Sequence, residues 1–168
     1  MFLRIATVAA SIMTCSALAA SAAGTGEHGT DAFTVAYVTT WSDTMPLGSQ
    51  TARLYESDGV STNDAGRPMF NNMGVHCFGL GETVAGVYSG QGNCAHTDKD
   101  GDKIFDKFAV NGPAGTFTVI GGTGKYSGLT GTGSFTRQMV QSPDGHVLSL
   151  VHEKVDWKSE TGAEAPAD

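Results

Sequence analysis

The most regularly spaced reactive side chains in this sequence lie in an acidic stretch near the middle of the chain. Carboxylates at alternate positions supply the oxygen ligands that Ca²⁺ prefers. The stretch differs from an EF-hand loop, because Lys and Ala stand at the sixth and twelfth positions, where that loop needs Gly and Glu. It could equally be a hairpin turn whose acids face water. The expected calcium ligands, on the first interpretation, are Asp98, Asp100, Asp102 and Asp106.

Three cysteines are present, and Cys15 lies in an apolar N-terminal run that we expect to be removed. That leaves Cys77 and Cys94, and two cysteines in an exported chain usually pair. The pattern predicts a Cys77–Cys94 disulfide. Two buried free thiols, or half of a metal site completed by His76 and His96, are the alternatives.

Polar residues that interrupt the apolar faces of strands are the candidates for a ligand pocket. Arg137 shares a strand face with Phe135 and Met139, whereas the neighbours His152 and Glu153 must point to opposite faces. Each candidate could instead be a solvated surface side chain. No nucleophile elbow occurs, and no catalytic residue is predicted. The expected pocket residues are Tyr37, Arg53, Tyr55, Glu56, His76, Arg137 and Glu153.

The elements that must position these residues are strands. Residues 33–41 alternate with a period of two and place Phe33, Val35, Tyr37 and Trp41 on one face. Residues 79–82, Gly-Leu-Gly-Glu, are interpreted as a hairpin turn, and the 23 glycines as turns and tight corners. About eight strands with few or no helices predict an all-β fold, a single small antiparallel eight-stranded barrel. The further strands are expected at 50–57, 73–78, 83–88, 104–110, 116–120, 134–140 and 146–157.

The N-terminus has the pattern of a secretory signal: Arg4, then an uncharged apolar run, then small residues. We expect residues 1–22 to be a signal peptide, 23–31 a flexible leader, 32–158 the barrel domain and 159–168 a disordered acidic tail. The apolar run is too short to span a bilayer, so no transmembrane segment is predicted. The net charge of −7 disfavours nucleic acid as a partner. The protein is expected to be periplasmic or secreted.

Residues 121–135 form a Gly-Thr-rich segment that begins Gly-Gly-Thr-Gly-Lys-Tyr. It is not a phosphate-binding P-loop, because Tyr126 stands where that motif requires Ser or Thr. Upstream, Cys77, the Gly90-x-Gly92-x-Cys94 motif and the acidic stretch resemble a group of small, exported bacterial barrel proteins. The Gly-Thr segment itself resembles the related allene oxide cyclase and dirigent proteins. These are eight-stranded β-barrels of the calycin type.

The resemblance implies a barrel whose interior holds a small, largely apolar molecule, and it implies that the chain could form homo-oligomers. It transfers no catalytic residue. The expected function is therefore an exported small-molecule-binding barrel. The alternatives are a cyclase or isomerase of the allene oxide cyclase type and a structural or interaction module with a filled core. No cofactor is expected apart from the Ca²⁺ considered above.

Overall fold

The structure is a computed structural model that describes residues 26–140, 142 and 146–160. The predicted signal peptide and most of the predicted tail lie outside the described residues. Among those residues, no helix has the length and hydropathy needed to cross a bilayer.

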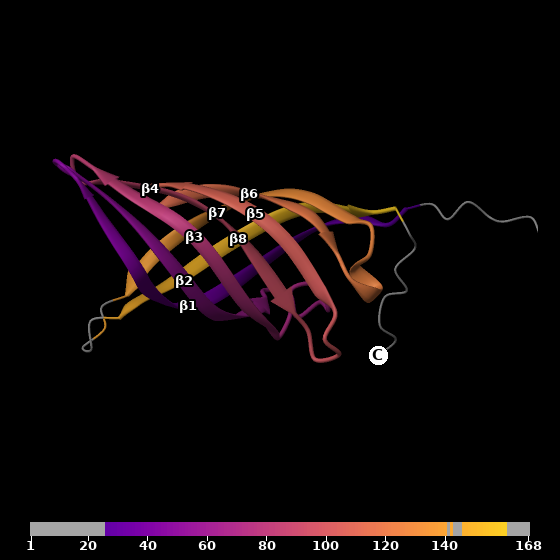
Figure 1. The fold of residues 1–168 in the computed structure, drawn as a ribbon. Helices are drawn as coiled ribbons and strands as arrows, with labels where there is room; N and C mark the ends of the chain where they lie inside the picture. The colour runs from indigo at the N-terminus through magenta and orange to yellow at the C-terminus, as the bar shows by residue number, and fades with distance from the viewer. Residues whose placement is uncertain (1–25, 141, 143–145, 161–168) are drawn as a thin grey trace, which may run out of the picture.

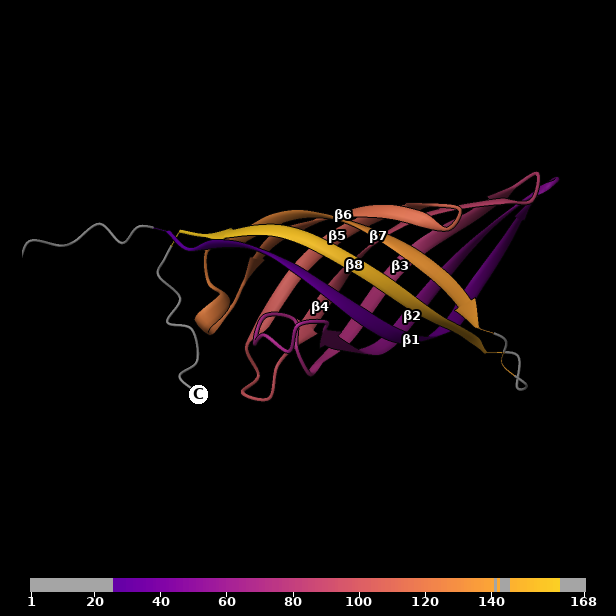
Figure 2. The same ribbon diagram turned by 180° about the vertical axis from the view of Figure 1, so that it is seen from behind.

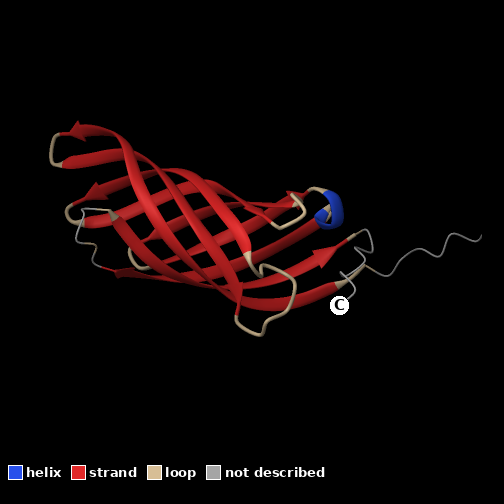
Figure 3. Ribbon diagram, turned by 90° about the horizontal axis from the view of Figure 1, so that it is seen from below, coloured by secondary structure: helices blue, strands red, loops and turns tan. Residues whose placement is uncertain are grey.

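Eight strands form a closed barrel in which each strand pairs antiparallel with the next and β8 pairs with β1 (Figures 1 and 2). The predicted all-β, eight-stranded antiparallel barrel is confirmed. One short 3-10 helix, η1 (Gly124–Tyr126), interrupts the connection between β6 and β7 (Figure 3). The strands are β1 (His28–Leu47), β2 (Gln50–Asn63), β3 (Met73–Val84), β4 (Val87–Thr97), β5 (Lys103–Asn111), β6 (Ala114–Gly122), β7 (Leu129–Val140) and β8 (Val147–Ser159).

Strand alternation divides the side chains into an inner and an outer set, and the connections into two ends. The turns after β1, β3 and β5 lie at one end, which we call the open end. The connections 64–72, 98–102 and 123–128 lie at the opposite end, together with the start of β1 and the end of β8. We call this second end the closed end.

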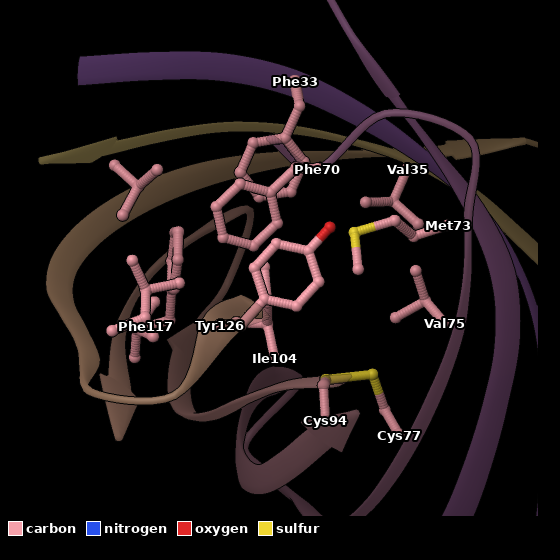
Figure 4. Packing of buried hydrophobic residues seen from close by; sticks show 13 residues of the cluster. Phe33, Val35, Phe70, Met73, Val75, Cys77, Cys94, Ile104, Phe117 and Tyr126 are labelled. Carbon is pink, nitrogen blue, oxygen red and sulfur yellow. A yellow bond between two sulfur atoms is a disulfide. The ribbon is translucent and has the colours of Figure 1, made fainter. Parts of the chain in front are cut away.

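The closed end is filled by a hydrophobic plug (Figure 4). Phe70, in the connection between β2 and β3, is fully buried and stacks on Phe33 with ring centroids 4.3 Å apart. Met73, Ile104 and Leu129 are fully or almost fully buried in the same cluster. The connection between β2 and β3 therefore folds back into the barrel and seals this end.

One side chain, Asn63, holds that connection in place. Its Oδ1 accepts hydrogen bonds from the backbone N–H groups of Ala65 (3.0 Å) and Arg67 (3.2 Å). Its Nδ2 donates to the Met69 carbonyl (2.8 Å) and to Asp31 (2.7 Å). Because these groups are at least partly buried, the bonds supply partners that water does not provide.

Many glycines lie within strands, and for these the prediction that glycines mark turns is wrong. A side chain at Gly79 would collide with the Tyr55 ring, and one at Gly81 with the Tyr88 ring. Gly115 and Gly133 are covered in the same way by Phe135 and Phe117. An aromatic ring on a neighbouring strand lies over each of these glycines, so the strand continues through them.

Two predicted boundaries are corrected by the same strand pairing. Residues 79–82 belong to β3, and the turn lies at Ala85-Gly86, where both residues have positive φ. Residues 28–31, expected in the flexible leader, are strand residues that pair with β8. Asp31 is buried and accepts a hydrogen bond from Trp157 Nε1 at 2.7 Å, which ties the start of β1 to the barrel.

Candidate ligand cavity

The barrel interior beyond the plug contains a cavity of about 360 Å³. Inward residues in this part of the barrel are small on some strands, for example Ser57 and Ser149, and they leave space that larger side chains would fill. Met139 and Arg53 line the cavity and are also exposed, so the cavity opens at the open end. The wall is mostly aromatic and aliphatic, with Tyr37, Trp41, Tyr55, Tyr88, Phe108, Val110, Phe117, Phe135, Met139, Val147 and Val151.

Five of the seven pocket residues expected from the sequence line this cavity, namely Tyr37, Arg53, Tyr55, Arg137 and Glu153. Glu56 and His76 do not, because alternation sends them to the outer surface. His76 Nδ1 lies 2.8 Å from Asp58 Oδ1 on the outside of the barrel. His152 also faces outward and hydrogen-bonds Thr34, so the predicted opposition of His152 and Glu153 is confirmed.

The deep part of the cavity, next to the plug, holds an acidic group of side chains. His96 Nε2 and Asp106 Oδ2 lie 2.9 Å apart, and both residues are almost completely buried. Burial and the charge of Asp106 raise the pKa of Glu153 well above its ordinary value. The pKa of Tyr37 is raised by burial and by the charges of Glu153 and Asp106. The Glu153 carboxyl therefore keeps its proton to a higher pH than an exposed glutamate does.

The part of the cavity nearest the open end carries the two cations of its wall. The Arg53 guanidinium lies 5.4 Å from the centroid of the Trp41 ring, and that of Arg137 lies 4.8 Å from the Tyr88 ring. Arg137 Nη2 also donates to the Gly112 carbonyl, in the turn between β5 and β6. The wall is thus basic near its opening and acidic at its base.

Sequence reasoning missed several cavity residues, above all His96 and Asp106. Asp106 had been grouped with the acidic stretch, but it lies two residues after the inward-facing Ile104 and so points into the barrel. His96 lies two residues after Cys94 on the inward face of β4. A strict period-of-two count from the cysteines and from Ile104 could have found both.

Cys77 and Cys94 are directly opposite on β3 and β4 and form a disulfide, as predicted. Both residues belong to the plug cluster and also line the cavity. Figure 4 shows the bond lying beside Ile104 and Val75. The disulfide therefore joins two strands at the boundary between packed and open interior.

The acidic stretch forms the turn between β4 and β5, and a lysine from the β6–β7 connection reaches it. Lys125 Nζ lies 2.6 Å from Asp98 Oδ2 and 3.0 Å from Asp100 Oδ2. Asp98 Oδ1 accepts the backbone N–H groups of Asp100 and Asp102. Partial burial of Asp98 opposes ionisation, but the hydrogen bonds from Lys125 and these amides outweigh it and lower the pKa.

Asp106 does not join the three loop carboxylates, because it faces the barrel interior. Within residues 26–140 and 146–160, no group of three or more His, Cys, Asp or Glu side chains is arranged to hold a metal ion. The ammonium of Lys125 supplies the positive charge between Asp98 and Asp100. Calcium binding by this loop stays a prediction, and it would require Lys125 to move.

No protein-family model and no curated protein matches the chain. Among solved structures, that of a pterocarpan synthase dirigent protein is similar, with a TM-score of 0.45 and 11% sequence identity. The match covers 77% of this chain and 86% of that chain. The barrel assignment follows from the strand pairing described above, and the similarity adds no residue role to it.

Proposed function

We propose that this chain is a binding barrel for a small, largely apolar molecule held in the interior cavity. The observation that carries the proposal is a cavity of about 360 Å³ with an aromatic wall and a few polar groups directed into it. Ligand sites in proteins have volumes of about 300–1,000 Å³ and this kind of lining. A module with a filled core is less well supported, because the inward side chains beyond the plug are too small to close the interior.

Binding can be tested with Nile red, a neutral apolar dye whose fluorescence rises in a dry pocket. We expect the wild-type protein to enhance the dye fluorescence with saturation at one site per chain. Ser149→Trp places an indole in the cavity and should abolish saturable binding. His152→Trp, on the outward face of the same strand, is the matched control and should leave binding unchanged. Equal binding by all three proteins would place the dye on the outer surface and contradict the proposal.

Native mass spectrometry of protein purified from its host would then identify a natural ligand. A mass excess that disappears in Ser149→Trp but persists in His152→Trp would assign that molecule to the cavity. Protein that carries no such excess from the host, and binds no dye, would contradict the proposal.

A cyclase or isomerase activity is the second candidate, and Glu153 is the observation that favours it. A neutral carboxyl in an apolar cavity is the kind of group that donates a proton to a bound substrate. Once a ligand is identified, its conversion by wild type and by Glu153→Gln separates enzyme from binder. An enzyme loses turnover in the variant, whereas a simple binder shows no turnover in either protein.

We also propose that the barrel works after export, in the periplasm or outside the cell. The disulfide supports this location, because such bonds persist in oxidising compartments. N-terminal sequencing of the protein recovered from its host tests the predicted cleavage after residue 22. Membership of the allene oxide cyclase and dirigent type of barrel, and homo-oligomer formation, remain proposals of the same kind; sedimentation analysis addresses the second.

A further inference from the structure

We propose that the cavity selects a ligand bearing a basic amine, with its ammonium group at the deep end beside Glu153 and Asp106. The apolar body of the ligand then lies along the aromatic wall toward the open end. This inference rests on the proposed function and names the chemical class of ligand for the same cavity.

The first observation is the distribution of charge around the cavity. Tyr37 faces the cavity from β1, and the Cys77–Cys94 disulfide faces it from β3 and β4. Among the described residues of β6, no titratable side chain faces the cavity. The two arginines lie near the opening, each over an aromatic ring. The remaining titratable or charged groups facing the cavity are Arg53 and Tyr55 from β2, Tyr88 and His96 from β4, Asp106 from β5, Arg137 from β7 and Glu153 from β8.

The deep end is therefore acidic without a free base. The one basic side chain there, His96, has its Nε2 engaged with Asp106 at 2.9 Å. Asp106 and Glu153 are close enough that the charge of Asp106 opposes ionisation of Glu153. A carboxylate-bearing ligand would add a third acid at this point. An ammonium group instead brings a positive charge between the two acids, and buried charges are tolerated when they are paired.

The second observation is the wall between the acids and the opening. Tyr37, Phe117 and Phe135 line the cavity together with the acids. Aromatic faces attract cations through the negative potential above the ring. The same faces bury the apolar part of a ligand. A cavity with acids at its base and aromatic rings along its wall should bind an organic cation more tightly than a neutral molecule of equal shape.

The third observation is a polar atom without a partner. His96 is almost completely buried, and its Nδ1 has no hydrogen-bond partner among the described residues. When a neutral imidazole donates its Nε2–H to Asp106, its Nδ1 is an acceptor. An ammonium group has three N–H donors, enough for Glu153, Asp106 and one further acceptor.

The binding reaction has a definite proton balance. Before binding, at a pH below the raised pKa of Glu153, the amine in solution and the Glu153 carboxyl both carry a proton. In the complex the ammonium keeps its proton, while Glu153 ionises to pair with it and releases one proton to solvent. The affinity for an amine should then rise up to about tenfold per pH unit while free Glu153 stays protonated. A neutral ligand that accepts a hydrogen bond from Glu153 releases no proton.

Isothermal titration calorimetry with three isosteric probes tests the inference: naphthylethylamine, naphthylethanol and naphthylacetate. Each is titrated at pH 7 in phosphate and in Tris, whose ionisation enthalpies differ, so that the difference in heat reports the protons released. We expect the amine to bind at least tenfold more tightly than the alcohol and to release about one proton. The acetate should bind most weakly.

Glu153→Gln should remove the proton release and weaken binding of the amine at least tenfold, a larger loss than the same substitution causes for the alcohol. If that variant fails to fold, the number of protons released when the wild-type protein binds the amine still tests the inference. Equal or tighter binding of the alcohol, or amine binding without proton release, overturns the amine inference and leaves the binding barrel standing. If none of the probes and no Nile red binds, the proposed function itself fails.

Discussion

The two ends of this barrel are built from the same eight strands and differ in how their interiors are filled. At the closed end, Phe33 and Phe70 stack in a dry cluster, and Asn63 and Asp31 satisfy the polar groups around it. At the open end the interior is a cavity, and apolar side chains are exposed around its rim. Those of the rim are Met45, Leu47, Val84, Val87, Met139 and Val140.

The difference arises from a connection that folds into the barrel at one end rather than from a change of fold. The inward positions of β2 include Ser57 near the middle and Ser61 near the plug, both small. At the closed end, Phe70 returns from the following connection and stacks on Phe33. No such segment returns at the open end among the described residues, where the hairpins are short. The comparison teaches that one regular barrel can have a packed core at one end and an open cavity at the other, depending on which connections fold inward.

The largest test of this comparison is removal of the plug. Phe70→Ala should lower the free energy of unfolding by about 3–5 kcal/mol, because it deletes a fully buried ring and leaves a void. Phe78→Ala is the matched control, since Phe78 is 50% exposed on the outer face. Urea unfolding measures both. Equal effects of the two substitutions would mean that the closed end is not the packed core described here.

The next test concerns the boundary between packed and open interior. Replacing both Cys77 and Cys94 with Ala removes a crosslink that spans 17 residues. The chain-entropy argument assigns about 3 kcal/mol to such a loop. We expect a loss of this size in urea unfolding, and a similar loss for wild type under reducing conditions. Reduction of the double variant should have no effect, and any further loss in it would point to a cause other than the disulfide.

The cavity and the acidic turn of the closed end should also respond to pH with opposite sign. Glu153 has a raised pKa in the folded state, so the folded protein binds more protons than the unfolded chain, and stability falls as pH rises above the carboxyl's ordinary pKa. The decline is at most about 1.4 kcal/mol per pH unit. Asp98 has a lowered pKa, so its contribution is present above the ordinary value and is lost as pH falls through the folded pKa.

Unfolding free energies from about pH 3 to pH 8 check both signs. Relative to wild type, Glu153→Gln should gain stability as pH rises, and Asp98→Asn should lose it as pH rises. Parallel curves for the two variants would show that the carboxyls of the cavity and of the closed end do not differ in the way described.

The smallest expected effect is that of calcium on the closed end. Because Lys125 already neutralises Asp98 and Asp100, millimolar Ca²⁺ should leave the Tm of the wild-type protein unchanged. Lys125→Met removes the ammonium and leaves the carboxylates free to bind Ca²⁺, so a rise in Tm with Ca²⁺ is expected only in this variant. A rise in the wild-type protein would support the calcium interpretation of the acidic loop.

The sequence predicted the barrel well because strand alternation and turns are local signals. Phe33, Val35 and Tyr37 share the inner face as expected, and the paired cysteines lie opposite each other. The turn at residues 79–82 was misplaced for a non-local reason. Gly79 is a strand residue only because the Tyr55 ring, 24 positions earlier, lies over it, and no local window contains that information.

The site residues were predictable where the alternation of inward and outward side chains along a strand places them in the interior. Tyr55, Arg137 and Glu153 were found because they interrupt apolar faces, whereas Glu56 and His76 were assigned to the wrong side of their strands. The role of Lys125 could not be predicted, since it depends on the β6–β7 connection folding toward the acidic turn. The plug was not predicted for the same reason, because Phe70 lies in a connection outside every predicted strand.

The glycine and aromatic pairs have a consequence for how this barrel could diversify. Any side chain at Gly115 would displace the Phe135 ring, and any at Gly79 would displace Tyr55, and both rings form part of the cavity wall. A single methyl group added at either glycine would thus change the shape of the cavity through the ring that it displaces. Diversification at these glycines is restricted, because the added carbon would also collide with the Ala109 carbonyl oxygen at Gly115 and lie 2.7 Å from the Gln91 carbonyl oxygen at Gly79.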